Sequence, residues 1–243
     1  MTEQFGGILF VDIETVPVQP AYAQLSEPMQ AEWERKARLI KNIADTTAGE
    51  LFEGRAGVYS EFAKIICIGF GTMYNAGGQW KLRLKTISGH NEHEVLTAFV
   101  RVVDRMAAMH GEVRFCGHNI REFDIPFICR RLVINGIPLP ACLRLSGKKP
   151  WEIHHIDTLE LWKFGDNKNY TSLSLLACVL GIPSPKGDID GSQVAEVYWR
   201  DGDLERIARY CTGDVLTSAK VWLRLRGGDH IDLIPDYADG GPG

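Results

Sequence analysis

The amino-acid sequence predicts an α/β domain in which a mixed five-stranded sheet is flanked by helices. Two observations support this class. Short apolar runs typical of buried strands come first, and later runs alternate with segments that repeat apolar residues every three to four positions. The 243 residues are 45% hydrophobic and no linker separates two apolar cores, so we expect one core that needs no disulfide or structural metal.

Five segments are expected to form the strands. The first, residues 8–13 (ILFVDI), is an uninterrupted apolar run, and Pro17 follows it. The third alternates between apolar and polar side chains, as a strand with one solvated face does, and a turn at residues 75–78 joins it to the second. The expected strands cover residues 8–13, 64–71, 80–87, 113–117 and 154–161.

Helices are expected where apolar residues recur with a period near 3.6. Asn91 is the expected N-cap of the first of these, and Gly111 lies just past its end. Asp124 opens the next helix, which Asn135 and Gly136 end. The expected helices cover residues 91–109, 124–134, 172–180 and 203–225.

Two segments lie outside this regular pattern. Residues from about 18 to 62 are charged and rich in helix-forming residues, so we expect a helical insertion between the first two strands. The stretch 227–243 is rich in Gly and Asp, and we expect an acidic, flexible tail there. Residues 1–226 are therefore expected to form a single domain.

The charge distribution excludes a strongly basic nucleic-acid-binding protein. The chain has 27 Lys and Arg against 31 Asp and Glu, a formal net charge of −4. No Lys or Arg follows Arg226, and four acids do, which leaves the rest of the chain balanced. A tight non-specific nucleic-acid binder is therefore not expected, but an enzyme that holds phosphates through metal ions is compatible with this balance.

The sequence also bears on the cellular compartment. The six cysteines include no CxxC pair, so a zinc ribbon is not expected. No apolar run approaches the roughly 20 residues of a membrane span, and the beginning of the chain, MTEQFGG, has no secretory signal pattern. We expect a cytoplasmic protein whose cysteines are free thiols.

The first strand ends in Asp12-Ile13-Glu14, which is the first motif with chemical potential. Side chains alternate along a strand, so Asp12 and Glu14 share one face. Two carboxylates side by side at a buried strand end are costly unless a cation neutralises them, and hard oxygen ligands suit Mg²⁺ or Mn²⁺. An exposed strand end would explain the same residues without a metal.

Two further motifs follow along the chain. In one, Asn119, Phe123 and Asp124 lie between a strand and a helix; in the other, Tyr210 and Asp214 share one face of the last helix. Each has a simpler explanation: Asp124 as a helix N-cap, Phe123 and Tyr210 as core aromatics, and Asp214 as a solvated residue.

A fourth group, His154-His155-x-Asp157, looks like a metal cluster. Adjacent side chains on a strand point to opposite faces, so we do not expect the two histidines to share a metal.

Taken in order, the three motifs resemble the DEDD superfamily of 3′→5′ exonucleases, which has the ribonuclease H-like fold. The residue five positions before Asp214 is Arg209, where the histidine branch has His, and Tyr210 stands four positions before it, as in the tyrosine branch (DEDDy). The stretches FVDIETVP, FCGHNIREFDIPFICRRL and ERIARYCTGDVLTSAKVWLRL are similar to the proofreading exonuclease domain of family B DNA polymerases. HHIDTLELW is also similar to stand-alone bacterial members. The resemblance covers roughly residues 8–226, and the 18–62 insertion matches only loosely.

The resemblance implies the roles of the acids and of the tyrosine. Asp12, Glu14, Asp124 and Asp214 would bind two Mg²⁺ or Mn²⁺ ions about 4 Å apart. Asp12 would bridge the ions, Glu14 and Asp214 would complete the ion on the side of the attacking water, and Asp124 would face the ion on the leaving-group side. Tyr210 would orient the water, because a phenol with a pKa near 10 is a poor base at neutral pH.

Substrate contacts are also implied by the resemblance. Thr15 and the backbone after Glu14 would meet the 3′-terminal nucleotide, Asn119 would hydrogen-bond near the second, and Phe123 would stack on or wedge a base. Basic residues that could track phosphates, or be merely solvated, are Arg121, Lys148, Lys149, Lys168 and Lys186.

The expected activity is metal-dependent 3′→5′ hydrolysis of nucleic acid with release of nucleoside 5′-monophosphates, single-stranded DNA being favoured over RNA. An exoribonuclease with the same site, and a catalytically inactive nucleic-acid-binding module, are the alternatives. No membrane association is expected, and no protein partner is indicated.

Overall fold

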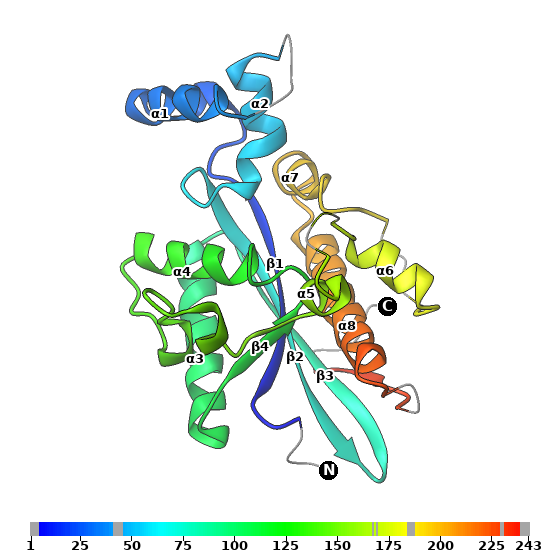
Figure 1. Ribbon diagram of the computed structural model, residues 1–243. Helices are drawn as coiled ribbons and strands as arrows, with labels where there is room; N and C mark the ends of the chain where they lie inside the picture. Colours follow the sequence, from blue (N-terminus) through cyan, green and yellow to red (C-terminus); the bar gives the residue numbers. More distant parts are fainter. Residues whose placement is uncertain are drawn as a thin grey trace.

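The computed structural model describes residues 5–40, 46–166, 168, 170–183, 188–228 and 231–238. One twisted, mixed sheet runs through the centre, and helices cover both of its faces (Figure 1). Its strands, in the spatial order β5-β4-β1-β2-β3-β6, are β1 (Ile8–Pro17), β2 (Ala63–Ala76), β3 (Gln79–Ser88), β4 (Arg114–Gly117), β5 (Ile156–Asp157) and β6 (Ile234–Tyr237). The α/β class and the mixed sheet are confirmed.

The first three strands form an antiparallel meander, and the other three add in parallel. β2 pairs antiparallel with both β1 and β3. β4 lies parallel to β1, β5 parallel to β4, and β6 parallel to β3. The helices are α1 (Glu27–Ala37), α2 (Ala48–Arg55), α3 (Glu92–His110), α4 (Asp124–Ile134), α5 (Thr158–Lys163), α6 (Leu173–Val179), α7 (Val194–Glu196) and α8 (Leu204–Leu225).

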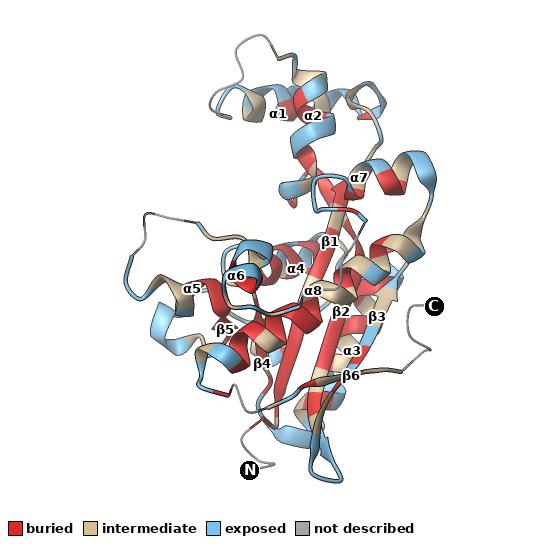
Figure 2. Ribbon diagram, turned by 90° about the vertical axis from the view of Figure 1, so that its right-hand side faces the viewer, coloured by how far each residue is buried: buried red, intermediate tan, exposed pale blue. Residues whose placement is uncertain are grey.

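Alternation along β1 divides the core between the two faces of the sheet. Leu9, Val11 and Ile13 belong to a buried cluster with the apolar faces of α3 and α4. Phe10 points to the other face and contacts Trp222 of α8 with ring centroids 5.5 Å apart. Buried residues accordingly follow the strands, while exposed ones lie on the outer sides of the helices (Figure 2).

The sheet has six strands rather than the expected five. The sixth, β6, comes from the segment that was expected to be a flexible tail, and that expectation is wrong for these residues. Leu233 is buried and Ile231 packs against the cluster that contains Trp222. Asp236 accepts a hydrogen bond from the Tyr74 hydroxyl at 2.5 Å and pairs with Arg83 at 3.2 Å, so one acid of the segment is tied to β2 and β3. Residues 239–243 lie outside the described residues.

The fifth strand is much shorter than expected. The prediction of a strand over 154–161 is wrong beyond Asp157, because the carboxylate of Asp157 accepts hydrogen bonds from the backbone N–H groups of Leu159 and Glu160. These bonds cap a helix, α5, and thereby end β5 after two residues. The expected N-cap of α3 is confirmed, since the Asn91 side chain accepts from the His93 N–H.

β1 and β2 are out of simple register where β1 passes the end of the insertion. Glu14 pairs with Cys67 and Thr15 with Ile65, which leaves Ile66 without a partner on β1. Such a β-bulge turns two successive side chains to one face. Ile66 and Cys67 accordingly both belong to the buried cluster on the side of α7 and α8, whereas Ile65 lies on the opposite face.

The segment between β1 and β2 is a helical insertion with its own core, as expected. Trp33 of α1 is fully buried and meets Phe52 and Phe62 edge-to-face at 5.3 Å and 5.0 Å. Its indole N–H donates to the Ala48 carbonyl at 2.7 Å. The insertion lies at one end of the sheet (Figure 1), the end at which β1 finishes.

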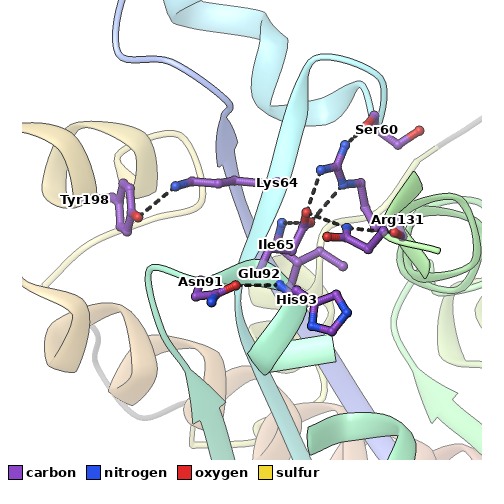
Figure 3. Close-up of polar contacts among 9 residues, drawn as sticks. Ser60, Lys64, Ile65, Asn91, Glu92, His93, Arg131 and Tyr198 are labelled. Atoms are coloured by element: carbon purple, nitrogen blue, oxygen red, sulfur yellow. Dashed lines mark hydrogen bonds and ion pairs between the residues drawn. The ribbon is translucent and has the colours of Figure 1, made fainter. Parts of the chain in front are cut away.

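A buried ion pair joins this insertion to the rest of the fold (Figure 3). Arg131 of α4 donates from Nε to Glu92 Oε1 at 2.8 Å and from Nη2 to Glu92 Oε2 at 2.5 Å. Its Nη1 donates to the Ser60 carbonyl at 2.8 Å, and Glu92 also accepts the Ile65 N–H at 2.7 Å. The network fixes α4, whose first residue is Asp124, against α3, β2 and the insertion. No helix in the described part of the chain is long and apolar enough to cross a membrane.

Candidate active site

Asp12 and Glu14 share one face of β1, and the face is the one that α8 covers. One carboxylate oxygen of each lies within 4.8 Å of the other and of Cys211 Sγ. Cys211 also donates to the Asp12 carbonyl at 3.4 Å, which seats α8 directly on β1. Glu14 is buried, so a solvent-exposed strand end does not explain the pair.

Asp124 enters this site from the first turn of α4. It is only 3% exposed, and its Oδ1 accepts the Ile13 N–H at 3.1 Å. The N-cap position of α4 is held by Phe123, so helix capping does not account for Asp124. The structure therefore brings a carboxylate from α4 to the backbone between Asp12 and Glu14.

Tyr210 and Asp214 come from α8, one helical turn apart. Burial raises the pKa of Asp214 to about 6. A side-chain hydrogen bond from the Tyr210 phenol acts in the opposite direction and is the weaker effect. The charge of Asp214 in turn helps to raise the pKa of Asp12 and of Glu14. All five residues that the sequence indicated as catalytic are thus brought together.

Burial and mutual repulsion govern the protonation of these groups. The pKa values of Asp12 and Glu14 are raised well above the usual range, first by burial and then by the neighbouring carboxylates. Burial raises the pKa of Asp124 to about 7, against the hydrogen bonds from its own N–H and from Ile13. The pKa of Tyr210 is also raised, by burial and then by Asp214, Glu14 and Asp12. The phenol therefore keeps its proton near neutral pH.

The donor set fits divalent cations. Asp12 Oδ2 is buried without a hydrogen-bond partner, and none of the four carboxylates has an ion pair with Lys or Arg within the described residues. Several buried carboxylates without a counter-charge are unfavourable unless a cation binds among them. Hard oxygen ligands of this kind suit Mg²⁺ or Mn²⁺.

The expected substrate-contact residues border this site in different ways. The Thr15 hydroxyl donates to the Gly57 carbonyl at 2.7 Å, so the side chain anchors the insertion. Asn119, five residues before Asp124, has a left-handed backbone with φ 61°. Phe123 is half-buried, with its ring 5.4 Å from that of Phe127, so core packing contributes to its environment. Their contacts with a nucleotide stay predictions.

Asp157 is a structural residue of this site that sequence reasoning did not identify. Its buried carboxylate accepts the N–H groups of Asn119 at 2.9 Å and Arg121 at 3.0 Å, besides capping α5. It therefore fixes the turn that leads to Asp124. The sequence offered only its proximity to two histidines. The two imidazoles have different partners: His154 pairs with Glu112 at 2.7 Å, and His155 accepts from Phe115 N–H.

The loop before α7 also borders the candidate active site, next to Tyr210. Ile189 is buried in the cluster that contains Tyr210, and Asp188 pairs with Arg206 at 2.8 Å. A side chain at Gly191 would place its Cβ 3.8 Å from the Tyr210 hydroxyl. This loop therefore forms the wall beside the phenol; Lys186, a candidate phosphate contact, lies outside the described residues.

Comparison with known proteins agrees with this arrangement. A family model described as a predicted 3′–5′ exonuclease related to the exonuclease domain of PolB matches residues 58–230. The match includes Asn119, Phe123, Asp124, Tyr210 and Asp214, and it begins after Asp12 and Glu14, which the fold places beside them. A search of curated proteins gave no match. The chain belongs to the family of predicted 3′–5′ exonucleases related to the PolB exonuclease domain, and is thus a hydrolase of nucleic acid with an α/β, ribonuclease H-like fold.

Proposed function

We propose that this protein is a metal-dependent 3′→5′ exonuclease that removes nucleoside 5′-monophosphates from the 3′ end of single-stranded DNA in the cytoplasm. The observation that carries the proposal is the convergence of four buried or partly buried carboxylates from β1, α4 and α8 on one place, where Asp12 Oδ2 has no partner. Nucleic acid is the substrate class that family membership implies.

Asp12, Glu14, Asp124 and Asp214 are the residues that would hold Mg²⁺ or Mn²⁺. Bound divalent ions supply a Lewis acid for the scissile phosphate and lower the pKa of a bound water. The chain itself supplies rigid positioning: Ile13 N–H orients Asp124, and Cys211 seats α8 against Asp12. Because the ligands come from three elements of one core, their mutual arrangement is set before substrate binds.

Tyr210 acts in this proposal by positioning and not as a base. The raised pKa of its phenol keeps the proton on the oxygen, so the hydroxyl can orient an attacking water by hydrogen bonding. Thr15, Asn119 and Phe123 are proposed to contact the terminal nucleotides.

Digestion of end-labelled oligonucleotides tests the proposal. Single-stranded DNA and RNA of matched sequence, labelled at either end, are incubated with Mg²⁺, Mn²⁺ or EDTA. Stepwise shortening from the 3′ end that stops in EDTA is expected, faster on DNA. A preference for RNA would overturn the substrate assignment, and an inert wild type would support a binding module without catalysis.

The variants Asp214→Asn and Tyr210→Phe separate the proposed roles. The first should abolish cleavage, and the second should slow it while metal-dependent protection against unfolding is kept. Asp104→Asn, which alters an exposed acid of α3, is the matched control and should cleave normally. Wild-type rates for Tyr210→Phe would show that the phenol does not position the water.

A further inference from the structure

Two largely exposed aromatic side chains border the turn that leads to Asp124, and the proposed mechanism does not use them. Trp151 is 73% exposed and Tyr170 is 66% exposed. Along the chain, Trp151 precedes β5 and Tyr170 follows α5. Exposed aromatic rings can stack on the bases of a nucleic acid, so these two are candidates for contact with a ligand.

Both rings are connected to the same turn. The Pro150 carbonyl, next to Trp151, accepts from Arg121 Nη2 at 3.0 Å. Tyr170 meets the His118 ring edge-on at 6.5 Å, and His118 Nε2 lies 2.8 Å from the carbonyl of Thr171. The two aromatics therefore stand beside residues 118–121, immediately before the helix that carries Asp124.

The buried carboxylate of Asp157 holds this turn in place. Asp157 accepts the N–H groups of both Asn119 and Arg121. Burial, and then the charges of Asp124 and Asp157, raise the pKa of Tyr170, and the edge-on contact with His118 places its ring beside this turn. Trp151 follows Pro150, the residue that Arg121 contacts.

Positively charged side chains lie near Trp151. Lys149 Nζ lies 5.2 Å from the centroid of Trp151, within the range of a cation–π contact. Lys148 precedes Lys149 in the chain, and Arg121 contacts the carbonyl of Pro150, the residue between Lys149 and Trp151. Aromatic rings beside Lys and Arg are the combination that binds single strands, because every base has a face that can stack and the cations meet the phosphates. Bases inside a duplex are not available for such stacking.

We infer that Tyr170 and Trp151 stack on successive parts of a nucleic-acid single strand whose 3′ end occupies the candidate active site, with Arg121 and Lys149 beside its phosphates. The inference rests on the proposed exonuclease function and extends it, since it assigns the path of the strand away from the acids. It also explains how a chain with net negative charge holds its substrate.

Binding of oligonucleotides of two lengths tests the path. Fluorescein-labelled oligothymidylates, a trimer and a dodecamer with phosphorothioate linkages that resist cleavage, are titrated with the full chain in Mg²⁺ and followed by anisotropy. Trp151→Ala should weaken binding of the dodecamer about tenfold, the usual effect of one lost stacking platform, with a smaller effect on the trimer. Tyr170→Ala should weaken binding of both lengths, and a duplex dodecamer should bind poorly.

The controls make the result decisive. Trp151→Phe keeps a ring and should restore most of the affinity, whereas Met109→Ala removes a 62% exposed side chain from the end of α3 and should change nothing. Wild-type affinity of both alanine variants for the dodecamer, or equal binding of duplex and single strand, overturns the inference. If the wild type degrades single strands while those variants bind normally, only the path is wrong; if it degrades none, the proposed function itself fails.

Discussion

Asp12 is the residue on which the electrostatics of the site depend most. It is surrounded by Glu14, Asp124 and Asp214, and one of its oxygens has no partner. A carboxylate of raised pKa destabilises the folded state at neutral pH, because the unfolded chain ionises it without this repulsion.

Asp12→Asn should therefore separate stability from activity. Without metal we expect a higher melting temperature, about 2–4 °C for each kcal/mol of relieved repulsion, together with a loss of cleavage of at least about a hundredfold. Thermal unfolding in EDTA and the digestion assay measure the two effects. A variant that melts lower and still cleaves would contradict the assigned role.

Phe164 illustrates a local backbone cost. It ends α5 with φ 45° and ψ 32°, and its side chain is 84% exposed. Glycine adopts this left-handed conformation without strain, so Phe164→Gly should stabilise the protein by about 0.4–1 kcal/mol. Gly181→Ala is the opposite control: its φ is +64° with no atom near the added Cβ, and it should destabilise by a similar amount in urea unfolding.

The attachment of α4 depends on the buried Glu92–Arg131 pair. Removing one partner leaves the other charge buried and unpaired, so Glu92→Gln should cost about 3–5 kcal/mol of unfolding free energy. The exposed pair of Arg35 and Glu32 within α1 is the matched control, and Glu32→Gln should cost less than about 1 kcal/mol. If chemical denaturation showed equal losses of unfolding free energy for the two variants, burial of the Glu92–Arg131 pair would not increase the cost of breaking it.

The elements differ in how well the sequence predicts them. α8 was expected over 203–225 and spans Leu204–Leu225, because its apolar spacing and its packing on the sheet agree. β5 was overestimated, since a capping aspartate can override local strand propensity. β6 was missed because its acids suggested a solvated tail, whereas Asp236 pairs with side chains of β2 and β3 that only the fold brings near.

The candidate site shows the same division. Asp12 and Glu14 follow from strand alternation, and Tyr210 with Asp214 from helical spacing, so their faces could be predicted locally. The role of Asp157 could not, because it consists of hydrogen bonds to residues 36 and 38 positions away along the chain. Tyr170 likewise gains meaning only from its place beside His118.

For the molecule as a whole, the acids predict how stability depends on pH. The folded-state pKa of Asp124 is raised from 3.8 to about 7, and that of Asp214 to about 6. At pH values between the ordinary and the raised pKa, the folded state holds more protons than the unfolded one. The free energy of unfolding in EDTA should therefore fall as the pH rises from about 4 to 7, by up to about 1.4 kcal/mol per pH unit for each proton.

Bound metal should reverse this trend. Ligands must be deprotonated to bind a cation, so Mg²⁺ affinity and cleavage should both increase over the range in which Asp214 and Asp124 ionise. Urea unfolding at several pH values, with EDTA or with Mg²⁺, checks both directions. Asp124→Asn should flatten the EDTA profile; an unchanged slope would contradict the assigned pKa.

The unpaired Ile66 in β2 limits how the length of this chain can change. Because Ile66 and Cys67 face the same side, deletion of one residue here would restore strict alternation and turn the preceding side chains over. Lys64 would leave the Tyr198 hydroxyl, 3.1 Å away (Figure 3), and Ile65 would leave the core beside α3. Among relatives, insertions and deletions should therefore accumulate within the helical insertion. The segment from Ala63 to Gly69 should keep its length of seven residues.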